Sequence, residues 1–269
     1  MVSLILPEFN EAMSYDSKFL IRAIAFITGL LAATRAYAQN PQFIPRYDFQ
    51  ISMAGLSSPD PRFSWDGVIS GDIDIVDYVK GRASLFAQYE VVMGHQLRTF
   101  DPNQGNYTFE GSSSVRAGGT EIAGVFHHLS RHLSDRANVT SISFNAVGGR
   151  VLRRVEFHKT AIDLRGDLEK GIEHEFLDYS WTAAAHVIAR RPISPVAGLF
   201  ARGDFETYGV DRSIAGRGNQ KGGHAEAGLR LKGEKGAVEF FAGWEQVVDA
   251  YPLERVARRW AFAGFRLTH

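Results

Sequence analysis

Apolar and polar residues alternate along much of this chain in short segments. Residues 159–169 give the clearest case, because Ile162 and Leu164 alternate there with Asp163 and Arg165. Successive side chains of a β-strand point to opposite faces, so this spacing predicts one apolar face and one charged face. A helix of the same length would scatter these charges around its surface. The pattern therefore predicts a protein built from strands.

The same alternation predicts about twelve strands. They are expected at 47–56, 64–79, 82–93, 106–116, 119–130, 139–153, 158–169, 179–190, 196–209, 222–233, 236–248 and 258–268. Tight turns are expected at 80–81, 117–118 and 233–235, and long loops at 94–105 and 210–221. The Ser-rich segment 106–116 is also compatible with a loop. An even number of strands, joined by alternating short and long connections, is typical of a membrane barrel.

These features favour an all-β fold, namely an antiparallel, up-and-down transmembrane β-barrel that forms a single domain over residues 39–269. A soluble sandwich is the alternative, because its strands also alternate. However, charges of both signs crowd one face of most predicted strands, as in a narrow lumen filled by paired side chains. Aromatic residues at strand ends suit the interfacial girdles of a barrel. They are Tyr179, Trp181, Trp244 and Phe265.

Residues 1–38 have the features of a secretory signal peptide. Lys18 and Arg22 precede an apolar run at 23–33, and the small-x-small pattern at 36–38 predicts cleavage after Ala38. The run is too short to span a bilayer, which takes about 20 apolar residues. Met13 would begin a signal peptide of more usual length, so the residues before it look like a mis-assigned start. Export predicts a location in the bacterial outer membrane, with the barrel-assembly machinery as a partner during insertion.

Composition removes several classes of function. The 30 Lys and Arg residues balance the 30 Asp and Glu residues, so no net basic charge favours nucleic acid as a partner. The absence of cysteine excludes disulfides, thiol chemistry and Cys-ligated metals. Nothing in the sequence points to a cofactor, and outer-membrane lipid or lipopolysaccharide is the expected partner.

The charged faces of the predicted strands are expected to line the lumen. The residues concerned are Asp72, Asp74, Glu90, Asp163, Arg165, Asp167, Arg202, Asp204, Glu226 and Arg230. They could line a narrow, porin-like pore. A plug of salt bridges is the plainer interpretation, because a barrel of this size leaves little room for a channel.

Histidine is concentrated in residues 124–135 (GVFHHLSRHLSD). Residues two apart share a face of a strand, so His128, Ser130 and His132 are expected to face lipid and His127 and Arg131 the lumen. A histidine beside a serine hydroxyl is the general-base arrangement that makes the hydroxyl nucleophilic. An interfacial hydrogen-bonding patch is the plainer alternative. The same imidazoles could also share a transition metal, although we assign no metal site.

The nearest carboxylate available to orient His128 in the sequence is Asp135. The catalytic candidates are therefore His128, Ser130 and Asp135. His127, Arg131 and His132 are the candidate binding residues.

This stretch resembles an uncharacterised family of bacterial outer-membrane barrels that carry His-x-Ser-Ser-His-Leu-Gly-Asp on a mid-barrel strand. The matching residues are His128, Ser130, His132, Leu133 and Asp135, whereas Arg131 and Ser134 replace Ser and Gly. The resemblance implies a fold and a location but no activity. It accords with an integral barrel that has a structural, ligand-binding or narrow-pore role.

A weaker resemblance is to lipid A deacylases, small barrels with a His-x-Ser pair and a nearby Glu on the lipid-facing surface. His128 and Ser130 match the pair, but the next Glu in the sequence is Glu156, at the wrong end of the next predicted strand. This resemblance implies an alternative function, the hydrolysis of a lipid in the outer leaflet.

Overall fold

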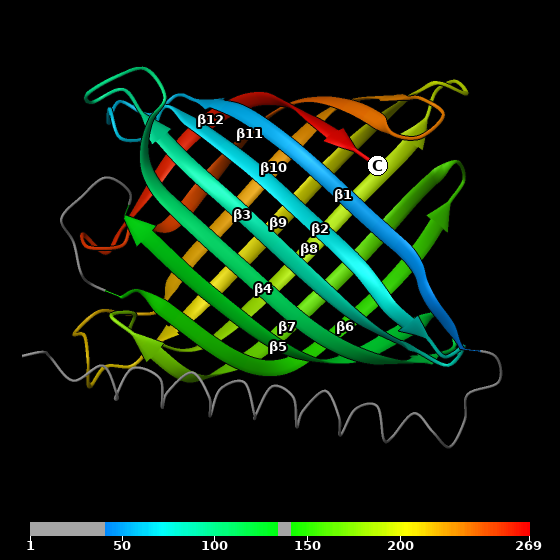
Figure 1. Ribbon diagram of the computed structural model, residues 1–269, viewed down its shortest axis with the longest axis horizontal. Helices are drawn as coiled ribbons and strands as arrows, with labels where there is room; N and C mark the ends of the chain where they lie inside the picture. Colours follow the sequence, from blue (N-terminus) through cyan, green and yellow to red (C-terminus); the bar gives the residue numbers. More distant parts are fainter. Residues whose placement is uncertain (1–40, 134–140) are drawn as a thin grey trace, which may run out of the picture.

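The computed structural model describes residues 41–133 and 141–269, which form twelve antiparallel strands closed into one barrel (Figure 1). The strands are β1 (Gln42–Leu56), β2 (Trp65–Asp77), β3 (Arg82–Gly94), β4 (Asp101–Ala117), β5 (Thr120–Leu133), β6 (Ser143–Phe157), β7 (Thr160–Glu175), β8 (Tyr179–Pro192), β9 (Ala197–Val210), β10 (Gln220–Lys232), β11 (Ala237–Tyr251) and β12 (Val256–Thr268). Each strand pairs with its neighbours in the chain, and β1 pairs with β12 to close the sheet. The predicted up-and-down barrel is confirmed. Within the described ranges, no helix is long and apolar enough to cross a membrane.

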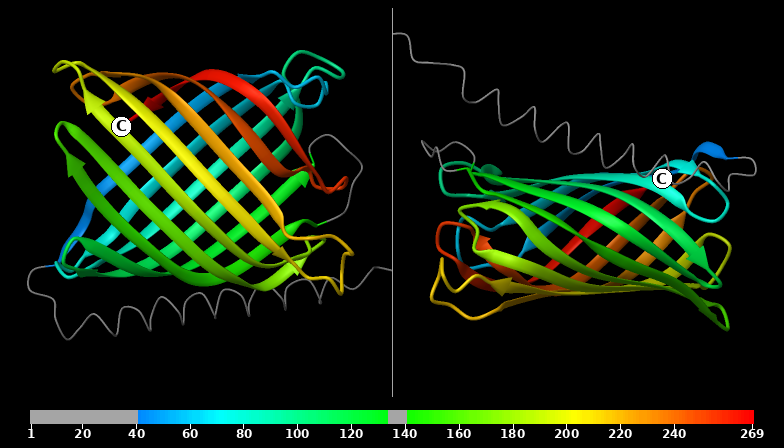
Figure 2. Two further views of the ribbon diagram at one scale, coloured as in Figure 1. Left: turned by 180° about the vertical axis from the view of Figure 1, so that it is seen from behind. Right: turned by 90° about the horizontal axis from the view of Figure 1, so that it is seen from below.

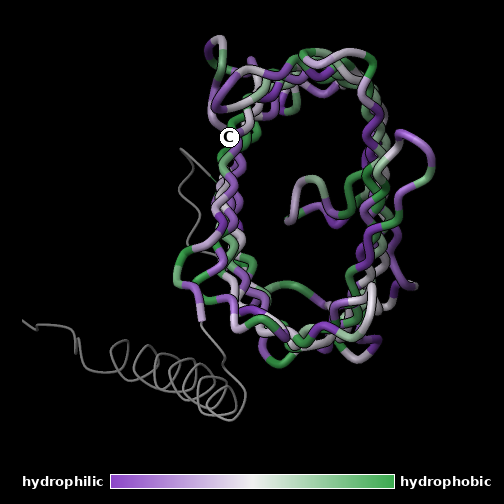
Figure 3. The backbone as a smooth tube through the Cα atoms, turned by 90° about the vertical axis from the view of Figure 1, so that its right-hand side faces the viewer, coloured by the Kyte–Doolittle hydropathy of each residue, from purple (hydrophilic) through white to green (hydrophobic). Residues whose placement is uncertain are grey.

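Alternation along each strand separates an apolar outward face from a polar interior. On β12, Phe265 and Leu267 are 42% and 45% exposed, whereas Arg266 between them is 4% exposed. A soluble sandwich would bury its large apolar side chains between two sheets. Here the strands run diagonally across both walls of a single ring (Figures 2 and 3). The exposed apolar side chains therefore form a continuous outer surface suited to hydrocarbon.

The connections at the two ends of the barrel differ in length. At the turn end, the strand pairs are joined at 78–81, 118–119, 158–159, 193–196 and 233–236. The β4–β5 hairpin shows why such turns form, because Ala117 pairs with Thr120 and Gly118 between them adopts a φ of 61°, which favours glycine. At the loop end, the connections are 57–64, 95–100, 134–142, 176–178, 211–219 and 252–255. The four longest connections, 57–64, 95–100, 134–142 and 211–219, thus lie at the loop end.

Two details differ from the sequence-based expectation. The Ser-rich strand begins at Asp101, before the expected residue 106, so the preceding loop covers only 95–100. Tyr179 was expected to face lipid, but it is 1% exposed inside the barrel. The cause is a β-bulge between Tyr179 and Trp181 in the pairing of β8 with β9. A bulge adds a residue to one strand, so the alternation predicted from the sequence fails beyond it.

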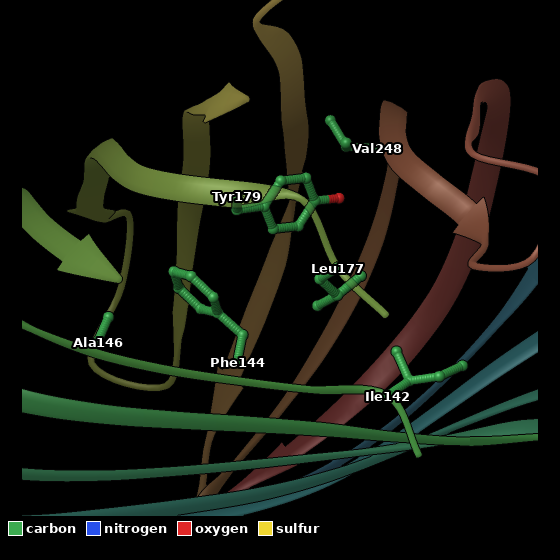
Figure 4. Close-up of a cluster of buried hydrophobic side chains, with 6 residues drawn as sticks. All are labelled: Ile142, Phe144, Ala146, Leu177, Tyr179 and Val248. Carbon is green, nitrogen blue, oxygen red and sulfur yellow. The ribbon is translucent and has the colours of Figure 1, made fainter. Parts of the chain in front are cut away.

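The barrel interior changes character along its axis. Toward the loop end, Ile142, Phe144, Leu177 and Tyr179 pack with Val248 in a buried apolar cluster (Figure 4). From mid-barrel toward the turn end, ion pairs replace the apolar contacts. Arg150 bonds Glu110 at 2.7 Å and Asp167 at 2.5 Å, and Arg266 bridges Glu226 and Glu239 at 2.8 Å each. Because these charges are buried, removing one partner of a pair should cost about 3–5 kcal/mol.

Candidate active site

Three polar side chains of β5 lie on the outward face near the loop end. His128, Ser130 and His132 continue the row of outward residues that includes Ile122, which is 54% exposed. β5 ends at Leu133, so these residues lie in the last part of the strand, next to the loop. A polar side chain on this face is unusual, since its neighbours toward mid-barrel are apolar. The position calls for a functional explanation.

His128 is held by an amide from the neighbouring strand. Asn145 of β6 lies directly opposite His128 in the register, and His128 Nδ1 is 2.6 Å from Asn145 Oδ1. An amide oxygen can only accept, so the imidazole donates from Nδ1–H. The neutral ring then carries its lone pair on Nε2, which is the form that can accept a proton. Asn145 is 6% exposed, so this bond is shielded.

The amide of Asn145 is itself oriented by Glu173 of β7. Asn145 Nδ2 donates to Glu173 Oε2 at 3.1 Å. A register shift between Asn145 and Ala146 brings this contact about, because Ala146 pairs with Gly171 while Asn145 pairs with Glu173. Without the bulge, Ile172 would stand opposite Asn145. Bulges beside functional sites commonly redirect a side chain in this way.

Ser130 lies between the two outward histidines of its own strand. Its Oγ is 3.0 Å from His132 Nε2, and it faces Tyr107 of β4 across the β4–β5 pairing. The ring of His132 meets that of Tyr107 edge-on, with centroids 5.3 Å apart. His128 lies two residues away on the other side of Ser130 and on the same face.

Serine, histidine and an orienting amide together form the parts of a nucleophilic site. A serine hydroxyl needs a nearby base, and the base needs a third group that fixes its tautomer and orientation. His128 with Asn145 has the second arrangement, and the hydroxyl of Ser130 lies two residues away on the same face. Asn145 thus occupies the place for which the sequence offered only Asp135. Because Asp135 falls outside the described residues, its expected role stays a prediction.

Comparison with solved structures gives the same architecture. Outer membrane phospholipase A from Escherichia coli superposes with a TM-score of 0.52 at 11% identity, over 84% of this chain and 97% of that one. The calcium-bound dimer of the outer membrane phospholipase from Salmonella typhi gives 0.51 at 11% identity, over 87% and 93%. No protein-family model matches the sequence, and no curated protein matches it. At this identity the likeness establishes the outer-membrane barrel fold alone.

The other binding candidates on β5 face the lumen. His127 Nδ1 lies 2.9 Å from Glu169 Oε2, and Arg131 donates to the backbone oxygen of Asp249 at 2.9 Å. Both residues are therefore separated from Ser130 by the thickness of the sheet. His132 alone of the three binding candidates shares the outward face with Ser130. Among the described residues, no group of three or more His, Asp or Glu side chains is arranged to hold a metal ion.

Most of the expected lumen charges form ion pairs inside the barrel, several of them with arginines outside that set. Asp74 bonds Arg46 and Arg82, and Arg190 bonds Asp163. Near the turn end they leave a cavity of about 580 Å³. Its walls include Asp72, Asp163, Arg165, Arg202, Asp204 and Arg230. Asp167 and Glu226 belong to the buried ion pairs described above, and Glu90 accepts from Asn106 Nδ2 at 2.7 Å.

At the loop end, a charged loop residue bonds two carboxylates inside the lumen. Arg217, in the loop between β9 and β10, bonds Asp178 and Asp249 at 2.6 Å each. Both carboxylates are fully buried. The hydrogen bonds to Asp249 and Asp178 raise the pKa of Arg217 above its ordinary value. This contact joins the loop to the apolar cluster below it, so the loop end is packed while the turn end holds the cavity.

Proposed function

We propose that this protein is an integral barrel of the bacterial outer membrane that hydrolyses an acyl ester of a lipid in the outer leaflet, with Ser130 as nucleophile and His128 as general base. The bond between His128 and Asn145, on the outward face beside Ser130, is the observation that carries this proposal. It supplies the orienting partner that the lipid-hydrolase alternative lacked in the sequence.

The position of the site supports a lipid substrate. Outer-membrane barrels have short turns on the periplasmic side and longer loops outside, so the loop end is the external end. Ser130 is then near the external interface, where the ester groups of membrane lipids meet their acyl chains. A lipid could reach the hydroxyl by lateral diffusion, with its chains along the apolar outer surface. The fold of two outer membrane phospholipases is compatible with this arrangement.

The proposed reaction proceeds through an acyl-enzyme. Ser130 Oγ attacks the ester carbonyl carbon, and its proton passes to His128 Nε2 while Asn145 Oδ1 holds the Nδ1–H of the resulting imidazolium. The tetrahedral intermediate then expels the alcohol, which takes the proton from His128. Water, deprotonated by His128, attacks the acyl-serine and releases the fatty acid. The hydroxyl and the imidazole are thereby restored.

The barrel interior does not favour the narrow-pore alternative. The apolar cluster at Phe144 and Tyr179 and the buried bonds of Arg217 occupy part of the lumen toward the loop end. The cavity at the turn end is lined by acids and bases that pair with one another. We therefore place the activity on the outside of the barrel.

Fatty-acid release from lipid tests the proposal. Purified protein would be incubated with phosphatidylethanolamine vesicles in one arm and with lipopolysaccharide in the other, and the released acids measured by mass spectrometry. We expect release in one arm, and a loss of about a thousandfold or more in Ser130→Ala because the nucleophile is absent. Ser143→Ala is the matched control, since Ser143 stands opposite Ser130 on β6. No release in either arm, or release that survives Ser130→Ala, would contradict the proposal.

A further inference from the structure

Side chains of three neighbouring strands are joined by a row of hydrogen bonds, and Glu173 stands at one end of that row. The row runs from Glu173 on β7 through Asn145 on β6 to His128 on β5. It ends beside Ser130, the proposed nucleophile. Glu173 is exposed, and the bulge at residues 171–173 is what places it opposite Asn145. We propose that Glu173 is a positioning residue for His128 and acts through the amide of Asn145; this inference rests on the proposed function.

The amide of Asn145 could face His128 in two ways. If the amide were rotated by half a turn, its Nδ2 would point at His128 Nδ1, and the imidazole would have to accept there and carry its proton on Nε2. Such a ring could not take a proton from Ser130. A carboxylate can only accept hydrogen bonds, so Glu173 selects the orientation in which Nδ2 faces Glu173 and Oδ1 faces His128.

The charge of Glu173 adds a second effect. When His128 becomes positively charged, the carboxylate one amide away stabilises the imidazolium electrostatically, and the polarised amide transmits part of that effect. Glu173 therefore orients His128 and stabilises the charge that forms on it during the reaction, while staying away from the reacting atoms. If Glu173 instead bound a lipid headgroup, its removal would raise KM and leave kcat unchanged. Kinetics therefore distinguishes a headgroup contact from a positioning residue.

Two substitutions separate orientation from charge. Glu173→Leu removes both, and we expect a loss of about 5- to 20-fold in kcat with KM within about twofold. Glu173→Gln keeps an acceptor but removes the charge. We expect a smaller loss, with the acidic limb of the pH–rate profile displaced to lower pH by about 0.3–0.5 unit, the size expected for one exposed charge. The direction follows because a less stabilised imidazolium loses its proton at lower pH.

Glu175→Gln and Glu175→Leu are the matched controls. Glu175 is an exposed acid on the same strand, two residues beyond Glu173. The same change of charge there should leave kcat and the pH–rate profile unchanged within error. A gel that compares boiled with unboiled protein would verify that each variant folds as a barrel. If Glu173→Leu does not fold, the pH–rate profile of Glu173→Gln still decides the question.

The decisive experiment is a double-mutant cycle with Asn145→Leu. If Glu173 acts through Asn145, Glu173→Leu should cost less than about twofold in kcat once Asn145→Leu is present. An equal loss in both backgrounds, or a rise in KM with kcat unchanged, would overturn the inference and make Glu173 a headgroup contact or an independent group. Loss of activity in Ser130→Ala with no effect of Glu173→Leu would leave the proposed function intact. Activity that survives Ser130→Ala would instead reject the proposed function.

Discussion

Two polar regions lie on the outward face near the loop end, and they are built from different kinds of side chain. The serine region consists of Ser130, His128, Asn145 and Glu173 on β5–β7. The arginine region, on β10–β12, consists of Lys221, Gln246 and Arg259. There, Arg259 Nε donates to Gln246 Oε1 at 2.6 Å, and Gln246 Nε2 donates to the backbone oxygen of Lys221 at 2.5 Å.

The side chains of the two regions differ in length and in conformational freedom. Lys221 and Arg259 are exposed, with long aliphatic stems that can lie along apolar surface while the charged ends reach the headgroups. The serine region uses short side chains whose partners are fixed across strands, and its central amide is almost fully buried. A polar side chain at the membrane interface therefore does not by itself indicate a catalytic site. A serine hydroxyl on the same face as a histidine with a fixed orientation is a more specific indication.

The largest effect should come from removing the proposed base. We expect His128→Ala to lower kcat/KM for lipid hydrolysis by at least about a hundredfold, because general-base catalysis is lost. Arg259→Ala, in the other region, should leave the rate within about twofold. Fatty-acid release from the same lipid by both variants checks this comparison. Equal losses would mean that the two regions act together on the lipid.

A smaller effect is expected within the serine region itself. His132 contacts the hydroxyl of Ser130, but its ring is exposed and meets Tyr107 edge-on. We expect His132→Ala to reduce kcat/KM by less than about tenfold, since His128 keeps its orienting bond to Asn145. Initial rates under the same conditions as for His128→Ala provide the measurement. A loss in His132→Ala that exceeds the loss in His128→Ala would reverse the assignment of the base.

The smallest effect concerns the loops beside the arginine region. Arg62 bonds Asp60 at 2.7 Å and Glu254 at 2.6 Å, and Arg258 bonds the same two carboxylates. Hydrogen bonds from Arg62 lower the pKa of Asp60 and, together with those from Arg258, the pKa of Glu254. Carboxylates with lowered pKa values stabilise the fold above their unfolded pKa values of about 4, and this stability is lost as the pH falls further.

The test compares unfolding temperatures in detergent at pH 7 and pH 3. Arg62→Gln should lower the unfolding temperature at pH 7 and have less effect at pH 3. The pH-dependent difference should be less than about 1 kcal/mol, because the pairs are partly exposed to solvent. An effect of Arg62→Gln that is equal at both pH values would show that the ion pairs contribute no pH-dependent stability. Hydrolysis by the serine region should be unaffected by this substitution at pH 7.

The architecture could be predicted from the sequence because a two-residue period is a local property. In segments such as 159–169, the order of apolar and polar residues predicts which side chains face outward and which face the lumen. The tight turns and loops between such segments then give the number of strands. The errors occurred where that period is interrupted. Tyr179 was expected outside, but the bulge beside Trp181 turns it into the lumen. No local signal in the sequence marks this bulge.

The candidate site could be predicted only in part for a related reason. His128 and Ser130 are two apart on one strand, so their common face follows from the alternation. Asn145 and Glu173 join them through strand register, which depends on an intervening loop and on a second bulge. Asn145 shares its face of β6 with Ser143 and Arg153, so no local signal in the sequence singled it out.

The junction between β1 and β12 has a consequence for biogenesis. It spans only residues 50–56 of β1, and it joins the first strand of the domain to the last. The chain can seal this junction only after every other strand has been made. The residues proposed for catalysis come from three consecutive strands that need no such closure. A nascent sheet that has not yet joined its own ends would therefore already present the complete set to the surrounding lipid.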